Sequence, residues 1–228
     1  MERVEWLKQM RSMAEALYDR ISPQYWVTFG LHKNEAHQQY LQEFLERVVP
    51  GGAVLSAGCG AGRYDGALLD AGHSVVGIDQ SAGMLARAQE RFPEIRYEKL
   101  GLQEMRFREA FDGVICIDAL EHVCPEDYPG ILRSFQEALK PGGILYFTVD
   151  TIGPEEAEAA YRRAKRRGLP VVLGEVVDGV DDAYERARVP GQPVPVDLAD
   201  RAVYHYYPSL EQVRAWIDQA GLAILEEG

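Results

Sequence analysis

Three alternate glycines, Gly58, Gly60 and Gly62, follow an apolar run and precede a helical stretch. Such a turn leaves backbone N–H groups free at the start of a helix, and glycine lets another molecule approach the main chain without meeting a Cβ atom. About twenty residues further on, the apolar run 74–78 ends in Asp79, whose carboxylate can accept hydrogen bonds from ribose hydroxyls. The two features together predict a nucleoside-binding site.

The spacing of the glycines distinguishes between nucleoside cofactors. Enzymes that bind dinucleotides carry G-x-G-x-x-G, which brings a helix N-terminus onto a pyrophosphate. Here the glycines read G-x-G-x-G and are followed by Arg63 and Tyr64. A pyrophosphate is therefore not expected, and a NAD-dependent oxidoreductase is the less favoured alternative.

Two later segments extend the pattern. Residues 118–122 (Asp-Ala-Leu-Glu-His) come directly after the apolar run 113–117, and residues 139–143 read Leu-Lys-Pro-Gly-Gly. With the glycine turn and Asp79, they resemble the class I S-adenosylmethionine-dependent methyltransferases in that family's order and spacing. The resemblance covers roughly Gln39 to Asp150. It implies an enzyme that binds S-adenosylmethionine, transfers its methyl group and releases S-adenosylhomocysteine.

The resemblance also implies which residues surround S-adenosylmethionine. They are Gly58, Cys59, Gly60, Gly62, Arg63, Asp79, Gln80, Met84, Gly101, Leu102, Asp118 and Ala119. Asp79 has an alternative role as a cap for the helix that Ser81 opens, and Asp118 as a capping or structural acid.

Two positions depart from the family's pattern. Ser56 stands where the family often has an acid that helps to hold the methionine ammonium group, and a serine gives up that charge. Gly101 stands where the family usually offers an acid to the adenine amino group, with Glu104 as a weak substitute. Weaker binding, a different anchoring acid and loss of catalysis all remain open. The alternative function is a non-catalytic protein that binds S-adenosylmethionine.

Two histidines are candidate catalytic bases. Methyl transfer from a sulfonium is an in-line displacement with an activated leaving group, so positioning is the protein's main contribution. A base helps a hydroxyl or a protonated amine to lose its proton, and a histidine with an ordinary pKa near 6.5 suits that role. His122 lies close to the expected methyl donor, and His205 sits among tyrosines near residue 208. Packing is the alternative role of each.

The methyl acceptor is expected to be a small molecule. Enzymes that methylate exocyclic amines of DNA bases carry an Asn/Asp-Pro-Pro-aromatic signature, and this signature does not follow the apolar run 113–117. Both oxygen and nitrogen acceptors stay open. The candidate acceptor-binding residues are Tyr18, Tyr25, Trp26, Asp150, Tyr204 and Tyr206. For the N-terminal aromatic residues, packing in the core is the alternative.

The composition restricts the kinds of molecule that this protein is expected to bind. The chain has 228 residues, of which 46% are hydrophobic, and 24 basic against 36 acidic residues give a net charge of −12. That field repels nucleic acid and anionic lipid, so neither is an expected partner. Cys59, Cys116 and Cys124 form an odd set without metal-type spacing, so no metal is expected. Reduced cysteines, a charged N-terminus and the lack of a long apolar run favour the cytoplasm.

The alternation of elements predicts a single α/β domain with a Rossmann-like, doubly wound, mostly parallel sheet and helices on both faces. The expected strands are 53–57, 74–78, 95–99, 113–117, 144–149 and 222–226, and the expected helices are 4–20, 36–48, 154–167 and 209–220. Ser22-Pro23 is expected to stop the first helix. Residues 1–50 are expected to form an N-terminal cap, 51–150 the cofactor-binding core, 151–208 a lid over the acceptor, and 209–228 a final helix and strand. A disordered insertion is the alternative for the lid segment.

Overall fold

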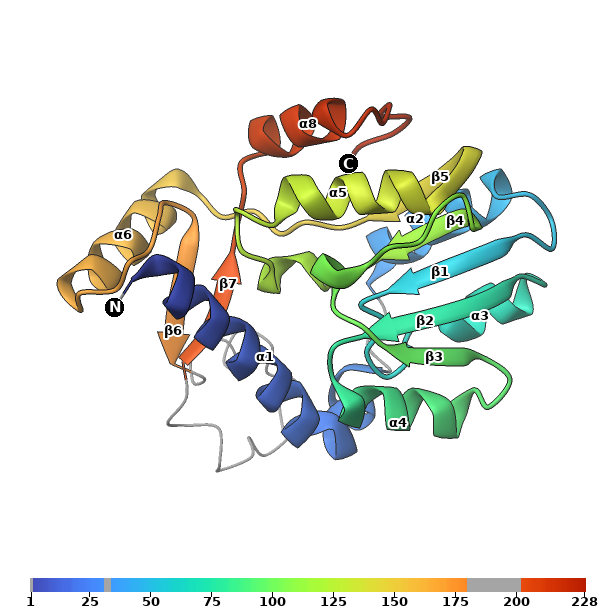
Figure 1. Cartoon of the computed structure of the whole chain (residues 1–228), viewed down its shortest axis with the longest axis horizontal. Coiled ribbons are helices and arrows are strands. Elements are labelled where there is room, and N and C mark those ends of the chain that lie inside the picture. The colour runs from blue at the N-terminus through green and yellow to red at the C-terminus, as the bar shows by residue number, and fades with distance from the viewer. Residues whose placement is uncertain (1, 31–33, 180–201) are drawn as a thin grey trace.

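The computed structural model describes residues 2–30, 34–179 and 202–228, and its centre is a five-stranded parallel sheet (Figure 1). The strands are β1 (Ala53–Ala57), β2 (Ser74–Asp79), β3 (Arg96–Lys99), β4 (Phe111–Cys116) and β5 (Leu139–Phe147). Their order is β3-β2-β1-β4-β5. The strand order reverses next to β1, so the carboxyl ends of β1 and β4 border the crevice in which such sheets bind ligands. The doubly wound prediction is confirmed.

The helices around the sheet are α1 (Arg3–Tyr25), α2 (Glu35–Arg47), α3 (Asp65–Asp70), α4 (Ala82–Arg91), α5 (Tyr128–Ala138), α6 (Pro154–Arg166) and α8 (Leu210–Gln219). Alternate strand residues pack into two cores. Leu55 and Val114 share one core with Phe135 of α5, whereas Val54 shares the other with Phe44 of α2. Both sheet faces are thus buried, as the unbroken apolar runs predict.

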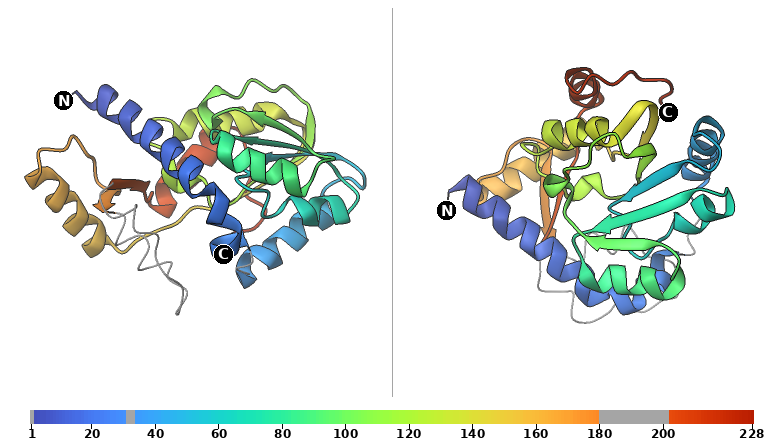
Figure 2. Two further views of the ribbon diagram at one scale, coloured as in Figure 1. Left: turned by 90° about the horizontal axis from the view of Figure 1, so that it is seen from below. Right: turned by 45° about the vertical axis from the view of Figure 1, so that its right-hand side comes forward.

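Helix α1 crosses the edge of the sheet at which the parallel strands end, so it faces the crevice (Figures 1 and 2). Its N-terminal end is held by Arg3, whose guanidinium forms ion pairs with Glu126 and with the fully buried carboxylate of Glu175. Its C-terminal part is tied to α4, because the Asp19 carboxylate accepts hydrogen bonds from Ser81 Oγ at 2.6 Å and from Gly83 N at 2.8 Å. These contacts fix the helix over the ends of the strands.

The predicted end of the first helix is wrong. The helix continues through Pro23 to Tyr25 and passes into a π-helical turn, Trp26–Gly30. Pro23 has no N–H for the carbonyl of Asp19, four residues earlier, but the Ser22 hydroxyl donates to that carbonyl at 2.9 Å instead. The side chain replaces the missing backbone bond, so the helix does not need to stop.

The insertion after β5 contains the predicted helix, α6, and a hairpin that the sequence did not indicate. Strands β6 (Glu175–Gly179) and β7 (Ala202–Tyr206) form a separate antiparallel sheet. This hairpin packs beside α1, where Trp6 meets Tyr204 edge to face with ring centroids 5.6 Å apart. The Gly- and Pro-rich stretch 189–195, which is part of the predicted lid, lies outside the described residues.

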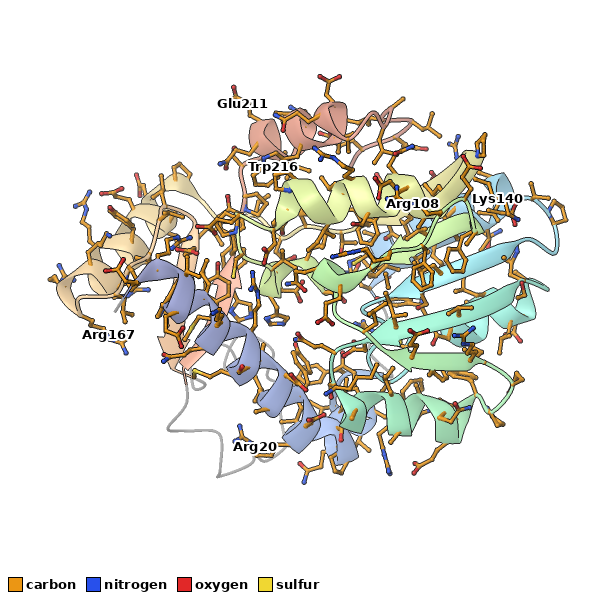
Figure 3. All side chains as sticks on the ribbon, in the orientation of Figure 1. Arg20, Arg108, Lys140, Arg167, Glu211 and Trp216 are labelled. Carbon is orange, nitrogen blue, oxygen red and sulfur yellow. The ribbon has the colours of Figure 1, made fainter. Side chains whose placement is uncertain are left out.

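The C-terminal helix is confirmed and the strand after it is not. Trp216 of α8 lies toward α5, where it packs on Tyr128 with centroids 5.0 Å apart (Figure 3). Residues 222–226 form no sheet pairing, and the side chains of Ile224 and Leu225 are 46% and 64% exposed. The run is apolar enough for a strand, but it does not meet a neighbouring strand at the sheet edge. No helix in the described residues is both long and apolar enough to span a membrane.

Candidate functional site

The glycine turn between β1 and α3 takes a backbone conformation that explains its composition. Gly58, Gly60 and Gly62 have φ values of +65°, +53° and +78°. A Cβ atom added to Gly58 would lie 2.6 Å from the Cβ of Ala119, so a side chain there would collide with the loop after β4. Both the left-handed backbone and the lack of space require glycine in this turn.

Asp79, at the end of β2, is hydrogen-bonded to the same turn. Its two carboxylate oxygens accept from Gly60 N at 2.9 Å and from Ser81 N at 2.8 Å. Burial raises the pKa of this carboxyl group, and the backbone N–H groups of Ser81, Gly60 and Gln80 work against that rise. A carboxylate has about four acceptor positions, so the backbone donors do not use all of them and acceptor capacity remains for a ligand. The capping role and the ribose-binding role of Asp79 are therefore compatible.

Two adjoining cavities open at this edge of the sheet. The larger has a volume of about 710 Å³ and the smaller about 370 Å³, and both border the glycine turn. The larger is lined by Arg11, Tyr18, Tyr25, Gly58, Gly60, Asp79, Gln80, Met84, Leu100, Gly101, Leu102, Gln103, Asp118, Ala119, His122 and Val123. The smaller is lined by Tyr25, Ser56, Ala57, Gly58, Cys59, Gly60, Arg63, Tyr64, Ile115, Ile117 and Asp118.

Helix α1 contributes a stripe of side chains at seven-residue spacing. Arg11, Tyr18 and Tyr25 all line the larger cavity. Seven residues are almost two full helical turns, so these side chains lie on one face at successive heights of about 10 Å. The amphipathic pattern in the sequence predicts the helix, but only its position over the strand ends gives this face a role in the site.

Tyr18 and His122 form a hydrogen-bonded pair at the cavity wall. The Tyr18 hydroxyl lies 2.7 Å from His122 Nε2, and His122 Nδ1 lies 3.2 Å from the carbonyl oxygen of Tyr204. A carbonyl only accepts, so Nδ1 carries the proton and Nε2 accepts from Tyr18. Burial lowers the pKa of His122 and raises that of Tyr18 well above its ordinary value. Both side chains are thus neutral at neutral pH.

Asp118 lines both cavities and has an unusual backbone for a residue with a side chain. Its φ is +51°, its carboxylate forms an ion pair with Arg63 at 2.8 Å, and His37 Nε2 lies 3.6 Å from the other oxygen. Its backbone N–H donates to Thr148 Oγ1 at 2.9 Å. Left-handed backbone in an Asp at a ligand cavity is typical of functional sites.

Acidic groups gather beyond Asp118. Burial, together with the charges of Asp118 and Asp150, raises the pKa of Glu121 to about 8. Glu121 Oε1 lies 3.7 Å from His122 Nε2. No group of three or more His, Cys, Asp or Glu side chains is arranged to hold a metal ion in the part of the chain that the structure describes.

The structure brings together nearly all of the predicted cofactor residues. Eleven of the twelve line one or both cavities, and Gly62 lines neither but packs against Asp65 beneath the turn. Tyr18 and Tyr25, predicted to bind the acceptor, also line the larger cavity. These placements agree with the predicted roles, which remain predictions.

Four other predicted acceptor residues do not line either cavity. Tyr204 and Tyr206 are 4% and 2% exposed, and the Tyr204 hydroxyl donates to Glu175 at 2.7 Å. Both tyrosines therefore belong to the core under the hairpin, because β7 turns these alternate side chains inward. Arg91 covers the Trp26 ring, with its guanidinium carbon 3.4 Å from the ring centroid. Asp150 is exposed.

The second candidate base lies behind the first. The His205 ring centroid is 4.9 Å from that of His122 and 5.9 Å from that of Tyr207. His205 does not line either cavity, whereas His122 lines the larger one. The structure thus favours His122 over His205 as the residue that meets a ligand.

Sequence reasoning missed Gln103, Arg11 and Asp65. Gln103 lines the larger cavity, and its Nε2 donates to Asp127, which also forms an ion pair with Arg11. Glu104, the expected substitute acid, instead accepts from Gly101 N at 3.1 Å and caps a short 3₁₀ turn, Leu102–Glu104. The seven-residue interval from Arg11 to Tyr18 was the available signal for Arg11.

Comparison with known proteins agrees with this geometry. The sequence model of a family described as "Methyltransferase domain" matches residues 54–143. A ubiquinone biosynthesis O-methyltransferase of Pseudomonas entomophila (strain L48) is 33% identical over 117 residues, which are 48% of this chain and 50% of that protein. The chain thus matches about half the length of this relative.

Solved structures share the fold. An S-adenosylmethionine-dependent methyltransferase from Methanosarcina mazei aligns with a TM-score of 0.60 and 17% identity, over 83% of this chain and 85% of that chain. One from Mesorhizobium loti aligns with a TM-score of 0.58 and 23% identity, over 85% and 84%. The glycine turn, the strand order and the family match lead to one conclusion: this chain contains a domain that matches the methyltransferase family over residues 54–143 and has the fold of the class I S-adenosylmethionine-dependent methyltransferases.

Proposed function

We propose that this protein transfers the methyl group of S-adenosylmethionine to a hydroxyl oxygen of a small molecule. The observation that carries the proposal is the Tyr18–His122 pair, a neutral proton acceptor at the wall of the cavity that the glycine turn and Asp79 border. The similar protein of Pseudomonas entomophila is named an O-methyltransferase, which favours oxygen over nitrogen.

The residues of the larger cavity fit S-adenosylmethionine. Gly58 has no Cβ that would collide with Ala119 beside the turn, and the Asp79 carboxylate keeps acceptor capacity for the ribose hydroxyls. Gln80 and Met84 are available to flank the adenine, and Asp118 is available near the methionine moiety. When bound, S-adenosylmethionine supplies a methyl group on a sulfonium, which leaves without further activation.

The acceptor's proton is taken by the chain's own residues. The acceptor hydroxyl gives its proton to the Tyr18 oxygen while the Tyr18 proton moves to His122 Nε2, so that Tyr18 stays neutral and His122 becomes the cation. His122 Nδ1 already donates to the Tyr204 carbonyl, so the ring is held in the tautomer that accepts at Nε2. Helix α1 forms part of the cavity wall, because Arg11, Tyr18 and Tyr25 all line it.

Calorimetric titration with S-adenosylmethionine, S-adenosylhomocysteine and NAD is the first test. We expect binding of the first two and no measurable binding of NAD. Release of S-adenosylhomocysteine is then measured with a panel of small phenols and small amines. Turnover with phenols supports the proposal, turnover with amines alone moves the acceptor to nitrogen, and binding without any turnover favours the non-catalytic alternative. Tighter binding of NAD would contradict the proposal outright.

Gln103 is proposed to take over the contact with the adenine amino group that the missing acid at position 101 would make. A Cβ atom added to Gly101 would lie 3.3 Å from Gln103 Oε1, so this oxygen occupies space near the absent side chain. The amide nitrogen is held by Asp127, which leaves Oε1 as the end that accepts from a ligand.

The prediction for Gln103 uses a ligand that lacks the amino group. S-inosylhomocysteine carries a carbonyl in place of that group, and we expect the parent protein to bind it at least tenfold more weakly than S-adenosylhomocysteine, because two acceptors then face each other. Gln103→Leu should remove most of this preference. Glu104→Gln is the matched control and should keep it, because Glu104 bonds to Gly101 N. Loss of the preference in Glu104→Gln alone would reassign the contact to Glu104.

A further inference from the structure

Asp65, the first residue of α3, carries a fully buried carboxylate beneath the glycine turn. Its oxygens accept from Ser56 Oγ at 2.6 Å and from the Tyr97 hydroxyl at 2.7 Å. Its backbone N–H donates to the Gly62 carbonyl at 3.2 Å, and a Cβ atom added to Gly62 would lie 3.1 Å from its carboxylate. The acid is therefore in direct contact with the turn that borders both cavities.

No cation neutralises Asp65 within the described residues. The groups that face it are the Ser56 hydroxyl from β1, Tyr97 from β3 and Cys59 from the turn, and Asp65 forms no ion pair there with a Lys, Arg or His side chain. Burial raises the pKa of Asp65 to about 6, and the two hydroxyl donors oppose the rise. Buried carboxylates are normally paired with a cation, so this one lacks a partner that a ligand can supply.

Ser56 connects Asp65 to the smaller cavity. Ser56 is one of the residues that line this cavity, and its hydroxyl proton is donated to Asp65. Its lone pairs are therefore free to accept from a ligand. A hydroxyl that donates to a carboxylate also becomes a stronger acceptor, because hydrogen bonds in a chain polarise one another. A cationic N–H donor placed at Ser56 would feel the charge of Asp65 through this bond.

We propose that Asp65, acting through Ser56, supplies the negative charge that holds the ammonium group of the methionine moiety of S-adenosylmethionine. The acid that strand β1 lacks at position 56 is thereby replaced by one from the start of α3. Asp65 is a positioning residue here, and the inference rests on the proposed function. The competing role is purely structural, in which Asp65 only fastens the glycine turn.

Two ligands separate these roles. S-adenosylhomocysteine carries the ammonium group, whereas 5′-methylthioadenosine has the same nucleoside without the amino acid part. Asp65→Asn should weaken binding of S-adenosylhomocysteine about ten- to thirtyfold and change binding of methylthioadenosine less than twofold. Ser56→Ala, which leaves Asp65 in place, should weaken only S-adenosylhomocysteine, by about three- to tenfold. The double variant Ser56→Asp with Asp65→Ser returns the acid to β1 and should recover most of the affinity.

The pH dependence of ligand affinity provides a second test, because a purely structural role of Asp65 would not produce it. The carboxylate must be charged to attract the ammonium, so the affinity of the parent for S-adenosylhomocysteine should rise as the pH rises through about 6. From pH 5 to pH 7 the ligand's amino group stays protonated, since its ordinary pKa is near 8. Dividing the affinity for S-adenosylhomocysteine by the affinity for methylthioadenosine at each pH removes the contribution of Asp79. Asp65→Asn should make this ratio independent of pH.

The outcomes are distinct. Equal weakening of both ligands in Asp65→Asn, or in Ser56→Ala if Asp65→Asn does not fold, would overturn the proposal in favour of the structural role. Unchanged affinity for S-adenosylhomocysteine in both variants would also overturn it. If the parent protein binds neither ligand, the proposed function itself has failed.

Discussion

Asp79→Ala should weaken binding of S-adenosylmethionine and S-adenosylhomocysteine at least tenfold, which is about 1.4 kcal/mol. The variant loses the acceptor for two ribose hydroxyls, and it also frees the Gly60 and Ser81 N–H groups that Asp79 now binds. Leaving buried donors unpaired costs roughly 1–3 kcal/mol each, so the free energy of unfolding should fall as well. Calorimetry gives the affinity, and urea denaturation gives the stability.

Asp112 provides the matched control for Asp79. Its carboxylate accepts from Ala53 N at 2.8 Å and from Lys140 Nζ at 2.7 Å at the beginning of the strands, the opposite edge of the sheet from the cavities. Asp112→Ala should therefore lower stability without a change in cofactor affinity. Equal affinity in Asp79→Ala and the parent would remove Asp79 from the site and leave it as a cap for α4.

His122→Gln should lower the turnover of a phenolic acceptor by about two orders of magnitude, the usual contribution of a positioned base. The dissociation constant of S-adenosylhomocysteine should change by less than about threefold, because the loss falls on the proton transfer. The pH dependence of turnover should have a definite direction. Burial lowers the pKa of His122 below 6.5, so parent turnover should be constant near neutrality and fall as His122 becomes protonated at lower pH. The variant should lack that fall.

Two further variants test the proposed proton transfer from the acceptor through Tyr18 to His122. Tyr18→Phe removes the hydroxyl that passes the proton and should lower turnover about ten- to thirtyfold. The His205 ring packs against the His122 ring and lines neither cavity, so His205→Ala should have a smaller effect. Turnover and pH dependence that match the parent in both His122→Gln and Tyr18→Phe would leave this pair structural. A larger loss in His205→Ala than in His122→Gln would restore His205 as the candidate base.

Local patterns were sufficient for the sheet and for much of the site. The sequence pattern predicts all five parallel strands, and it is clearest for β1 and β4, which lie inside the sheet and contain few polar residues, whereas β3 is a polar edge strand. The glycine turn and Asp79 were found because backbone geometry and a strand end restrict these positions to a few residue types. Pro23 shows the limit of such reasoning, since a rescue by the Ser22 hydroxyl depends on side-chain geometry.

The sequence by itself determined the fold class and the position of the glycine turn, since each depends on neighbours that are close in the chain. Only the tertiary structure decided that Tyr18 meets His122 across 104 residues, that Tyr204 and Tyr206 turn into the core, and that Asp65 lies behind Ser56. These contacts depend on how α1, β7 and α3 pack against the strand ends. That packing is set by the whole core at once, and residue spacing does not encode it.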